Sequence, residues 1–251
     1  MTLPRVVEAE TLDHLLPDDP AAMRSRRDLV RVHRAMGTRS ILIRELAGLV
    51  SSDRATKPLQ ILELGAGDGT LLLALAGALK PRWPSVQLTL LDRQRLVTPA
   101  TLAGYTALGW EVDVLVTDII DWAGESEAKG SKDTKGAPAQ RWDLILTTLF
   151  LHHFEPDALG PLLAAVAARS DRFLACEPHR SGLALLGSHL IGAIGANAVT
   201  RQDAVLSVHA GFRGNEISAL WPLNAGTWRL REAGAGLFSH CFSAQRSAEE
   251  R

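Results

Sequence analysis

Residues 60–80, QILELGAGDGTLLLALAGALK, constrain the fold more than any other part of the chain. An apolar run leads directly into three glycines at alternate positions, and a leucine-rich segment follows them. Glycines permit a tight turn and let a ligand approach the backbone closely. The stretch therefore predicts a strand, a glycine loop and a helix, which together begin a βαβ unit.

The same alternation continues through the middle of the chain. Runs of strand character are apolar along most of their length, which is typical of parallel strands covered by helices on both faces; they lie at 86–92, 111–118, 142–148 and 172–178. Helical spacing is found at 69–80, 98–109 and 156–169. Residues 123–140 are small and polar, which predicts a loop, and residues 227–246 predict a hairpin that closes the sheet edge.

Composition excludes some classes of function. The 27 Lys and Arg residues nearly cancel the 28 Asp and Glu residues, so no overall field attracts nucleic acid. Arginines are crowded only at residues 23–45, which we interpret as helical with one solvated basic face. Its buried side would be supplied by Val30, Val32, Met36, Ile41 and Leu42.

Several features indicate an intracellular, cytoplasmic protein. Cys176 and Cys241 lie inside apolar runs, which favours buried thiols in a reducing compartment. The first 20 residues contain acids and prolines in place of an apolar signal core. The apolar run at 182–199 is diluted by glycines, His189 and Asn197, so we expect no membrane span.

The glycine spacing narrows the class of ligand. A dinucleotide site requires G-x-G-x-x-G, whereas Gly65, Gly67 and Gly69 form G-x-G-x-G with Asp68 inside the loop. A carboxylate at this point would repel a diphosphate. Glu63 and Asp68 can instead attract a positively charged amino-acid end of a ligand that lacks phosphate.

Further acids follow at the ends of the next two strands. Asp92 lies where a carboxylate can accept hydrogen bonds from ribose hydroxyls, and Asp118 lies where it can contact the exocyclic amine of an adenine. Each acid alone could serve as a structural cap. Together with the glycine loop, they indicate a site for adenosine joined to an amino acid.

With these motifs in order, residues 58–178 resemble the class I methyltransferases that use S-adenosylmethionine. ELGAGDGT, LLD, TD and DLILTTLFLHHF stand as the first to fourth motifs. The resemblance implies an α/β fold with a Rossmann-like, mostly parallel seven-stranded sheet, helices on both faces and a C-terminal antiparallel hairpin. It implies S-adenosyl-L-methionine as cofactor, with four further contacts at Ala66, Arg93, Ile119 and Thr148.

The remaining segments are expected to complete a single domain of residues 1–251. Residues 1–57 form a helical cap, 58–178 the cofactor-binding core, 179–225 an acceptor lid and 226–251 the hairpin. Within the lid, we expect one helix capped by Thr200 and ended by Gly211, and another capped by Asn215 and stopped by Pro222. The apolar run of the lid is expected to line a hydrophobic acceptor pocket.

The sequence LFLHHF after the fourth strand resembles that of methyltransferases acting on small aromatic, polyketide and quinone-type metabolites of secondary metabolism. His152 or His153, with His153 favoured, is expected to be the base for methylation of a hydroxyl or an activated ring carbon. The Asn or Asp, Pro-Pro and aromatic tetrad typical of methylation at nucleobase amino groups is absent. The polar groups expected nearest the acceptor are His179, Arg180, Arg201 and Asp203.

The metal content, two alternative functions and the oligomeric state complete the expectations from sequence. The histidine spacing fits no standard zinc signature, so we expect no metal. The arginine-rich segment leaves an RNA or protein methyltransferase as an alternative, although we expect no nucleic-acid partner. A non-catalytic protein that binds S-adenosylmethionine is the other alternative, and homodimerisation is undecided.

Overall fold

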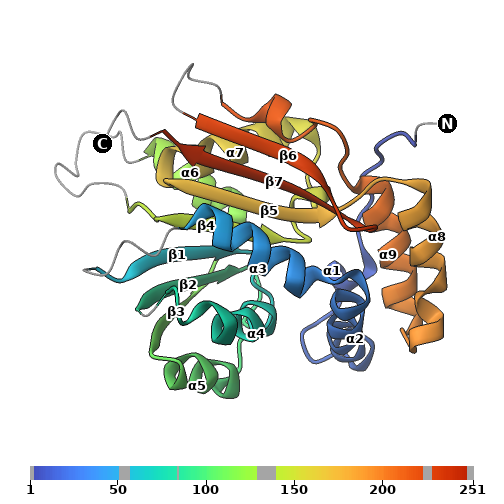
Figure 1. Ribbon diagram of the computed structural model, residues 1–251. Coiled ribbons are helices and arrows are strands. Elements are labelled where there is room, and N and C mark those ends of the chain that lie inside the picture. Colours follow the sequence, from blue (N-terminus) through green and yellow to red (C-terminus); the bar gives the residue numbers. More distant parts are fainter. Residues whose placement is uncertain (1–2, 51–56, 84, 129–139, 223–227, 248–251) are drawn as a thin grey trace.

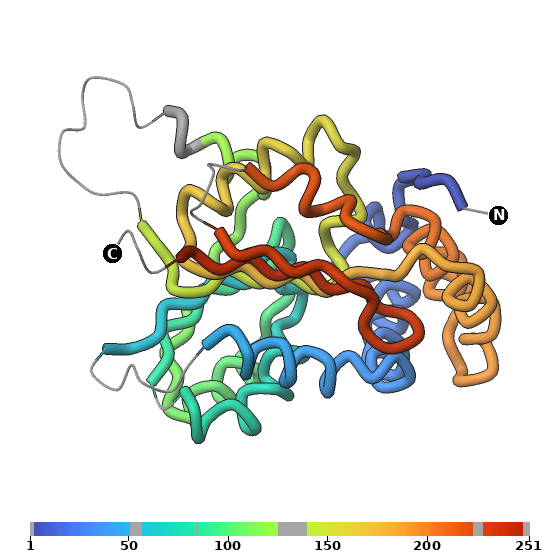
Figure 2. Tube along the Cα trace, turned by 45° about the horizontal axis from the view of Figure 1, so that its top comes forward, coloured from blue at the N-terminus to red at the C-terminus, as the bar shows by residue number. Residues whose placement is uncertain are grey.

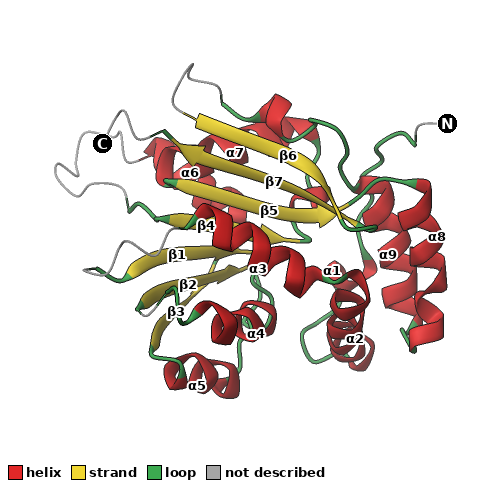
Figure 3. Cartoon of the chain, viewed as in Figure 1, coloured by secondary structure: helices red, strands yellow, loops and turns green. Residues whose placement is uncertain are grey.

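The chain forms one seven-stranded sheet with helices on both faces (Figures 1 and 3). The structure is a computed structural model that describes residues 3–50, 57–83, 85–128, 140–222 and 228–247. The strand order is β3-β2-β1-β4-β5-β7-β6. In chain order the strands are β1 (Leu59–Leu64), β2 (Val86–Asp92), β3 (Trp110–Val116), β4 (Leu144–Thr148), β5 (Arg172–Pro178), β6 (Trp228–Ala235) and β7 (Ser239–Arg246).

The first five strands are parallel, and the order reverses between β1 and β4. β7 pairs antiparallel with both β5 and β6. The predicted parallel sheet and hairpin are therefore confirmed. In a sheet of this kind ligands bind beyond the carboxyl ends of the strands at the reversal, which here lies between the loops after β1 and β4.

Two apolar cores lie on opposite faces of the sheet, because its strands are buried on both sides. One core includes side chains from α3 (Thr38–Leu49), α4 (Thr70–Leu79) and α5 (Pro99–Ala107). The other includes side chains from α6 (Ile119–Ala128) and α7 (Pro156–Arg169). Cys176 and Cys241 face each other across β5 and β7 as buried free thiols, as expected.

The remaining helices gather at the carboxyl end of the sheet. They are α1 (Thr11–His14), α2 (Pro20–Met36), α8 (Gly182–Leu190) and α9 (Ala198–Ala210), with short 3-10 turns at η1 (Leu151–His153) and η2 (Ile191–Ile194). A third 3-10 turn, η3 (Ser218–Leu220), instead packs against α7 and β6. α9 packs against α1, α2, α8 and η1. Figure 2 shows the N-terminal segment beside the helices that follow β5. The helices before β1 and those after β5 therefore form one layer, which we refer to as the cap.

Most predicted elements lie where expected, with boundaries that differ by one or two residues. The expected loop at 123–140 is wrong at its start, because α6 continues to Ala128; residues 129–139 lie outside the described part. α6 is anchored by Trp122, which packs near Trp142, and by Arg169, whose guanidinium donates to the carbonyl oxygen of Trp122 at 2.7 Å.

Two expected helix starts are also wrong. Asn197 caps α9, since its side chain accepts from the amide of Thr200 at 2.8 Å, and Thr200 lies inside the helix. Gly211 does end α9. The helix expected after Asn215 is reduced to the 3-10 turn η3.

The arginine-rich segment folds as α2 and α3, as expected. Asp19 caps α2 by accepting from the amides of Ala21 and Ala22. Val32, Ile41 and Leu42 are buried, whereas the expectation for Val30 is wrong: it is 50% exposed. Val30 stands on the outer face of α2 because the buried positions Ala22, Ser25, Asp28 and Val32 occupy the opposite side of the helix.

Candidate functional site

The glycine loop connects β1 to α4 at the point where the strand order reverses. Gly65, Gly67 and Gly69 have φ values of 66°, 57° and 71°, a region in which side chains are strained. A Cβ atom at Gly65 would also overlap the ring of Phe150, which follows β4. At Gly67, a Cβ would meet nothing within 4 Å, so the loop faces open space at its centre.

Glu63, at the carboxyl end of β1, lies below this loop. Its side chain is buried, and its Oε2 atom has no hydrogen-bond partner among the described residues. Burial raises the pKa of Glu63 to about 8, and the charges of Asp68 and Asp92 add to the effect. In the part of the chain that the structure describes, the buried hydroxyl of Thr148, at the end of the adjacent strand β4, also lacks a partner. Because buried polar groups are nearly always hydrogen-bonded, two unsatisfied oxygens at neighbouring strand ends indicate a ligand.

The other predicted acids stand at the same edge. Asp92 accepts from the amide of Gly67 at 2.9 Å, which ties the glycine loop to the end of β2, and from the amide of Gln94 at 2.9 Å. Asp68 accepts from the amide of Thr70 at 3.0 Å at the start of α4. Asp118 accepts from the amide of Ile120 at 2.8 Å. Each carboxylate retains lone pairs for a ligand.

The other residues that we predicted to contact the cofactor differ from one another in their surroundings. The amide of Ala66 donates to the carbonyl oxygen of Leu91 at 3.0 Å, so the loop backbone is anchored to β2. Ile119 is 6% exposed. Arg93 is directed toward the N-terminal segment, where it forms an ion pair with Asp13 at 3.3 Å. Arg93 thus links the end of β2 to the cap.

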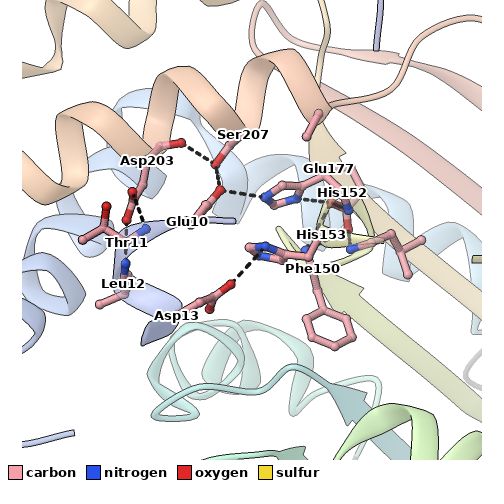
Figure 4. A network of polar contacts seen from close by, with 12 residues as sticks. Glu10, Thr11, Leu12, Asp13, Phe150, His152, His153, Glu177, Asp203 and Ser207 are labelled. Atoms are coloured by element: carbon pink, nitrogen blue, oxygen red, sulfur yellow. Dashed lines mark hydrogen bonds and ion pairs between the residues drawn. The ribbon is translucent and has the colours of Figure 1, made fainter. Parts of the chain in front are cut away.

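The turn after β4 is organised by Glu177, a fully buried residue on β5. Leu149 adopts a φ of 52°, and this left-handed residue turns the chain at the end of β4. The Glu177 carboxylate then accepts from the amides of Phe150 at 3.1 Å and Leu151 at 3.0 Å. Its negative charge is therefore held in place by backbone donors beneath the two histidines (Figure 4).

His152 lies between two carboxylates. Its Nδ1 is 2.8 Å from Oε2 of Glu177, and its Nε2 is 3.3 Å from Oε1 of Glu10 (Figure 4). Burial opposes the charged form, but the hydrogen bonds to Glu10 and Glu177 outweigh burial and raise the pKa to about 9. Both ring nitrogens are thus occupied, and the ring is held as an imidazolium at neutral pH.

His153 differs from its neighbour. Its Nδ1 lies 3.3 Å from a carboxylate oxygen of Asp13, and no partner of its Nε2 is found in the described part of the chain. Its ring stands edge-on to Phe150, with 6.3 Å between centroids, and Phe150 in turn lies against Gly65. Burial and the nearby positive charge of His152 lower the pKa of His153, so its ring is neutral at neutral pH.

The N-terminal segment is held over these histidines by α9. Asp203 accepts from the amides of Thr11 and Leu12, each at 2.9 Å. Ser207 donates to Glu10, and these contacts position Glu10 and Asp13 opposite the histidine pair (Figure 4). The site is therefore assembled from segments separated by about three quarters of the chain's length.

The four predicted acceptor-binding residues do not meet in one pocket. Arg180 donates to the carbonyl oxygen of Leu3 at 3.0 Å and to Glu216, and Asp203 holds the N-terminal segment. The ring of His179 stacks on His240, with 5.8 Å between centroids. Arg201 instead lines a cavity of about 450 Å³ between α8 and α9, together with Ser188, His189, Ala198, Gln202, Val205 and Leu206.

We expected the apolar run of the lid to line a hydrophobic acceptor pocket, and this expectation is wrong for the leucines on its solvent-exposed side. Leu183, Leu186 and Leu190 of α8 are 49%, 56% and 60% exposed. The helix that packs against the histidine turn η1 is α9, and α8 packs against α9. These leucines consequently face away from the histidines.

Sequence reasoning missed Glu177, Glu10, Asp13 and Phe150. Glu177 had a usable signal, because it ends a strand next to β4 in the same way that Asp92 ends β2. Glu10 and Asp13 had none, since nothing local to residues 3–14 indicates which surface the segment will cover.

Glu10, His152 and His153 also present possible metal ligands, whose atoms lie within 4.8 Å of one another. Each of the two His152 nitrogens and Nδ1 of His153 already faces a carboxylate oxygen. We therefore interpret this group as an ion-pair network.

The arrangement of the sheet and the glycine loop defines the Rossmann-like methyltransferase fold, and solved structures agree. The plantazolicin methyltransferase BpumL in complex with SAH has a TM-score of 0.58 at 14% identity, with 92% of each chain covered. The mitomycin 7-O-methyltransferase MmcR has a TM-score of 0.53 at 21% identity, and the pyocyanin biosynthetic protein PhzM 0.52 at 18%. Each match covers 92% of this chain, but only 59% of MmcR and 60% of PhzM.

These similarities concern the fold. No family model matches the chain, and no curated protein matches it in sequence. Within the described residues, every helix is too short or too polar to cross a membrane.

Proposed function

We propose that the protein transfers a methyl group from S-adenosyl-L-methionine to a hydroxyl or an activated ring carbon of a small hydrophobic aromatic, polyketide or quinone-like metabolite. The observation that carries the proposal is the unsatisfied Glu63 carboxyl below an open glycine loop, next to Asp68 and Asp92. This acidic edge suits a ligand with a positive charge and ribose hydroxyls. No Lys or Arg stands within the loop to receive a phosphate.

The residues present fit this cofactor. Glu63 would face its positive amino-acid end, Asp92 its ribose and Asp118 its adenine. When bound, the cofactor supplies an electrophilic methyl group attached to a sulfonium. The protein then has two tasks: to hold the acceptor atom in line with that methyl group, and to exclude water.

His153 is the proposed base for a hydroxyl acceptor. Its Nε2 would accept the proton of the acceptor hydroxyl, which makes that oxygen the nucleophile for the methyl group that the bound cofactor supplies. Asp13, on Nδ1, fixes the tautomer that leaves Nε2 free to accept the proton. The lowered pKa of His153 keeps this nitrogen unprotonated at neutral pH.

His152 is a positioning residue in this proposal, because both its nitrogens are occupied by carboxylates. Its fixed positive charge lowers the proton affinity of His153 and holds Glu10 in place. The nature of the acceptor is supported by the similar folds of enzymes whose names refer to plantazolicin and mitomycin.

Calorimetric titration with S-adenosylmethionine and S-adenosylhomocysteine tests the first step. We expect dissociation constants on the order of micromolar for both. Methyl incorporation into a panel of phenols and hydroxylated quinones then tests the reaction. A folded sample that binds neither compound contradicts the proposal. Binding without turnover on any acceptor would favour the non-catalytic alternative.

A further inference from the structure

Two exposed faces of the cap have no role in the proposed reaction. The first is on α8 and η2, where Leu183, Leu186, Leu190 and Ile194 are 40–60% exposed. On α8 the spacing places Leu183, Leu186 and Leu190 within an arc of about 60° around the helix axis, and Ile194 follows in the 3-10 turn η2. We refer to these four residues as the leucine stripe. Soluble surfaces rarely keep such a row of large apolar side chains without a partner.

The second face is on α2. Arg24, Arg27, Arg31 and Arg34 are all exposed, and they also share one side of the helix. We refer to these four residues as the arginine face. Met23 and Val30, 49% and 50% exposed, stand along its edge. Among the described residues, Arg24, Arg27 and Arg34 have no acidic partner, whereas Arg31 forms an ion pair with Asp28 at 2.9 Å.

The two faces adjoin. Arg31 donates from Nη1 to the carbonyl oxygen of Gly195 at 3.0 Å, and Gly195 immediately follows the last residue of the leucine stripe. The arginine face and the leucine stripe therefore meet at one end, at Gly195.

The exposed charges of this surface are positive, because the acid of α2, Asp28, is buried and paired with Arg31. Residues 182–202 contain no Asp or Glu, and their charged side chain is Arg201. Arg201 and His189 line the 450 Å³ cavity between α8 and α9, and Val205 and Leu206 contribute apolar lining. This groove combines cationic and apolar groups in the same way as the larger surface around it.

We propose that this surface docks the protein on an anionic lipid bilayer, with the leucine stripe inserted at the headgroup boundary and the arginine face against lipid phosphates. Interfacial helices bind in this manner, through an apolar face together with neighbouring cations. The inference is independent of the proposed methyl transfer, since docking requires neither the cofactor site nor the histidines.

Two other occupants fit the surface less well. A nucleic acid would contact the arginines but would leave the leucines against water or phosphate, and neither α2 nor residues 182–202 offers an aromatic side chain of Phe, Tyr or Trp for base stacking. A second copy would place arginines against arginines, and Asp28, the acid of α2, is buried and already paired with Arg31.

Co-sedimentation of the whole protein with vesicles tests the proposal. The vesicles contain phosphatidylcholine alone, or phosphatidylcholine with about one third phosphatidylglycerol. We expect binding to the anionic vesicles to be at least about tenfold stronger, and to weaken with added salt. The double variant Leu186→Glu/Leu190→Glu should lose more than about tenfold in binding. The double variant Arg24→Glu/Arg27→Glu should lose a similar amount, since each arginine contributes about fivefold.

Matched controls separate docking from general effects. Ile120→Glu changes an apolar residue of α6 that is 49% exposed, and Arg229→Glu changes an exposed arginine of the edge strand β6. Both should bind anionic vesicles like the wild type, and all variants should unfold at similar temperatures.

Three results would overturn the proposal. The first is equal binding of the wild type to neutral and anionic vesicles, or none to either. The second is light scattering that shows a dimer which Leu186→Glu/Leu190→Glu converts to a monomer, without vesicle binding. The third is binding of single-stranded RNA that the arginine variant abolishes and the leucine variant preserves, again without vesicle binding.

Discussion

Replacing Glu63 with Gln should stabilise the protein and weaken its ligand binding at the same time. The carboxyl is buried, its Oε2 lacks a partner, and its pKa is raised from 4.5 to about 8. The native state therefore holds the Glu63 proton more tightly than the unfolded chain does. The stability that this proton contributes is fully present below pH 4.5 and is lost as the pH rises through about 8.

The size of the effect follows from the two pKa values. The full change is about 5 kcal/mol, and about 4 kcal/mol of it falls between pH about 5 and pH about 9. Glutamine does not titrate, so Glu63→Gln avoids this loss. For a chain of this length, the advantage of the variant in melting temperature should grow by about 8 to 16 °C across that range.

Differential scanning calorimetry of both proteins at the two pH values measures this difference, and titration with S-adenosylmethionine measures the affinity. We expect Glu63→Gln to bind at least about tenfold more weakly, because glutamine cannot ionise as Glu63 would when the cationic ligand binds. Asp113→Asn, a change at an exposed acid on β3, is the matched control. A pH-independent difference in melting temperature would refute the reasoning about burial. Unchanged affinity would refute the proposed role of Glu63 in binding.

Other predictions concern the ribose contact, the base, the buried carboxylate and the metal. Asp92→Ala should weaken cofactor binding by more than about tenfold in calorimetry, and unchanged affinity would exclude the ribose contact. His153→Gln should lower kcat by about 100-fold or more and leave cofactor affinity intact. The fall in rate that we expect for the wild type below pH 6.5 should be absent from this variant. Full activity of the variant would exclude His153 as the base. Glu177→Gln should lower the free energy of unfolding by about 3 to 5 kcal/mol in urea titrations, because it leaves His152 charged and incompletely paired. A decrease as small as that caused by Glu111→Gln, a change at an exposed residue, would contradict this prediction. Treatment with EDTA should leave activity unchanged, and a loss restored by a divalent ion would show that the ion-pair network binds metal.

Much of the cofactor edge could be predicted from sequence, because its determinants are local. Gly65, Gly67 and Gly69 directly follow an apolar run, and parallel strands bring their carboxyl ends to one edge. Any chain with this pattern places Glu63 and Asp92 near the same loop. The C-terminal hairpin was predictable for a similar reason, since its two strands are joined by a short turn.

The histidine pair shows where local reasoning stops. LFLHHF indicated that one of two histidines could be a base, but adjacent side chains point in different directions, and the sequence could not assign their partners. Only the tertiary structure places Glu177 and Glu10 on His152 and leaves Nε2 of His153 without a partner among the residues that it describes. Those partners come from β5 and from the N-terminal segment, which α9 holds in position.

The difference between what the sequence indicates and what the tertiary structure shows is largest in the cap. Its helices are apparent from spacing and caps, yet the sequence alone suggested that its apolar run lines a pocket. Helical periodicity shows that side chains share a face, but not what that face contacts. Packing of α8 on α9 leaves the leucine stripe in solvent, and packing of α2 on α9 leaves the arginine face outside. The sequence by itself determined the sheet, its order of motifs and the acidic glycine loop, because these depend on neighbours in the chain. The pairing of the histidines and the outward direction of both exposed faces depend on contacts between distant segments, and only the tertiary structure decided them.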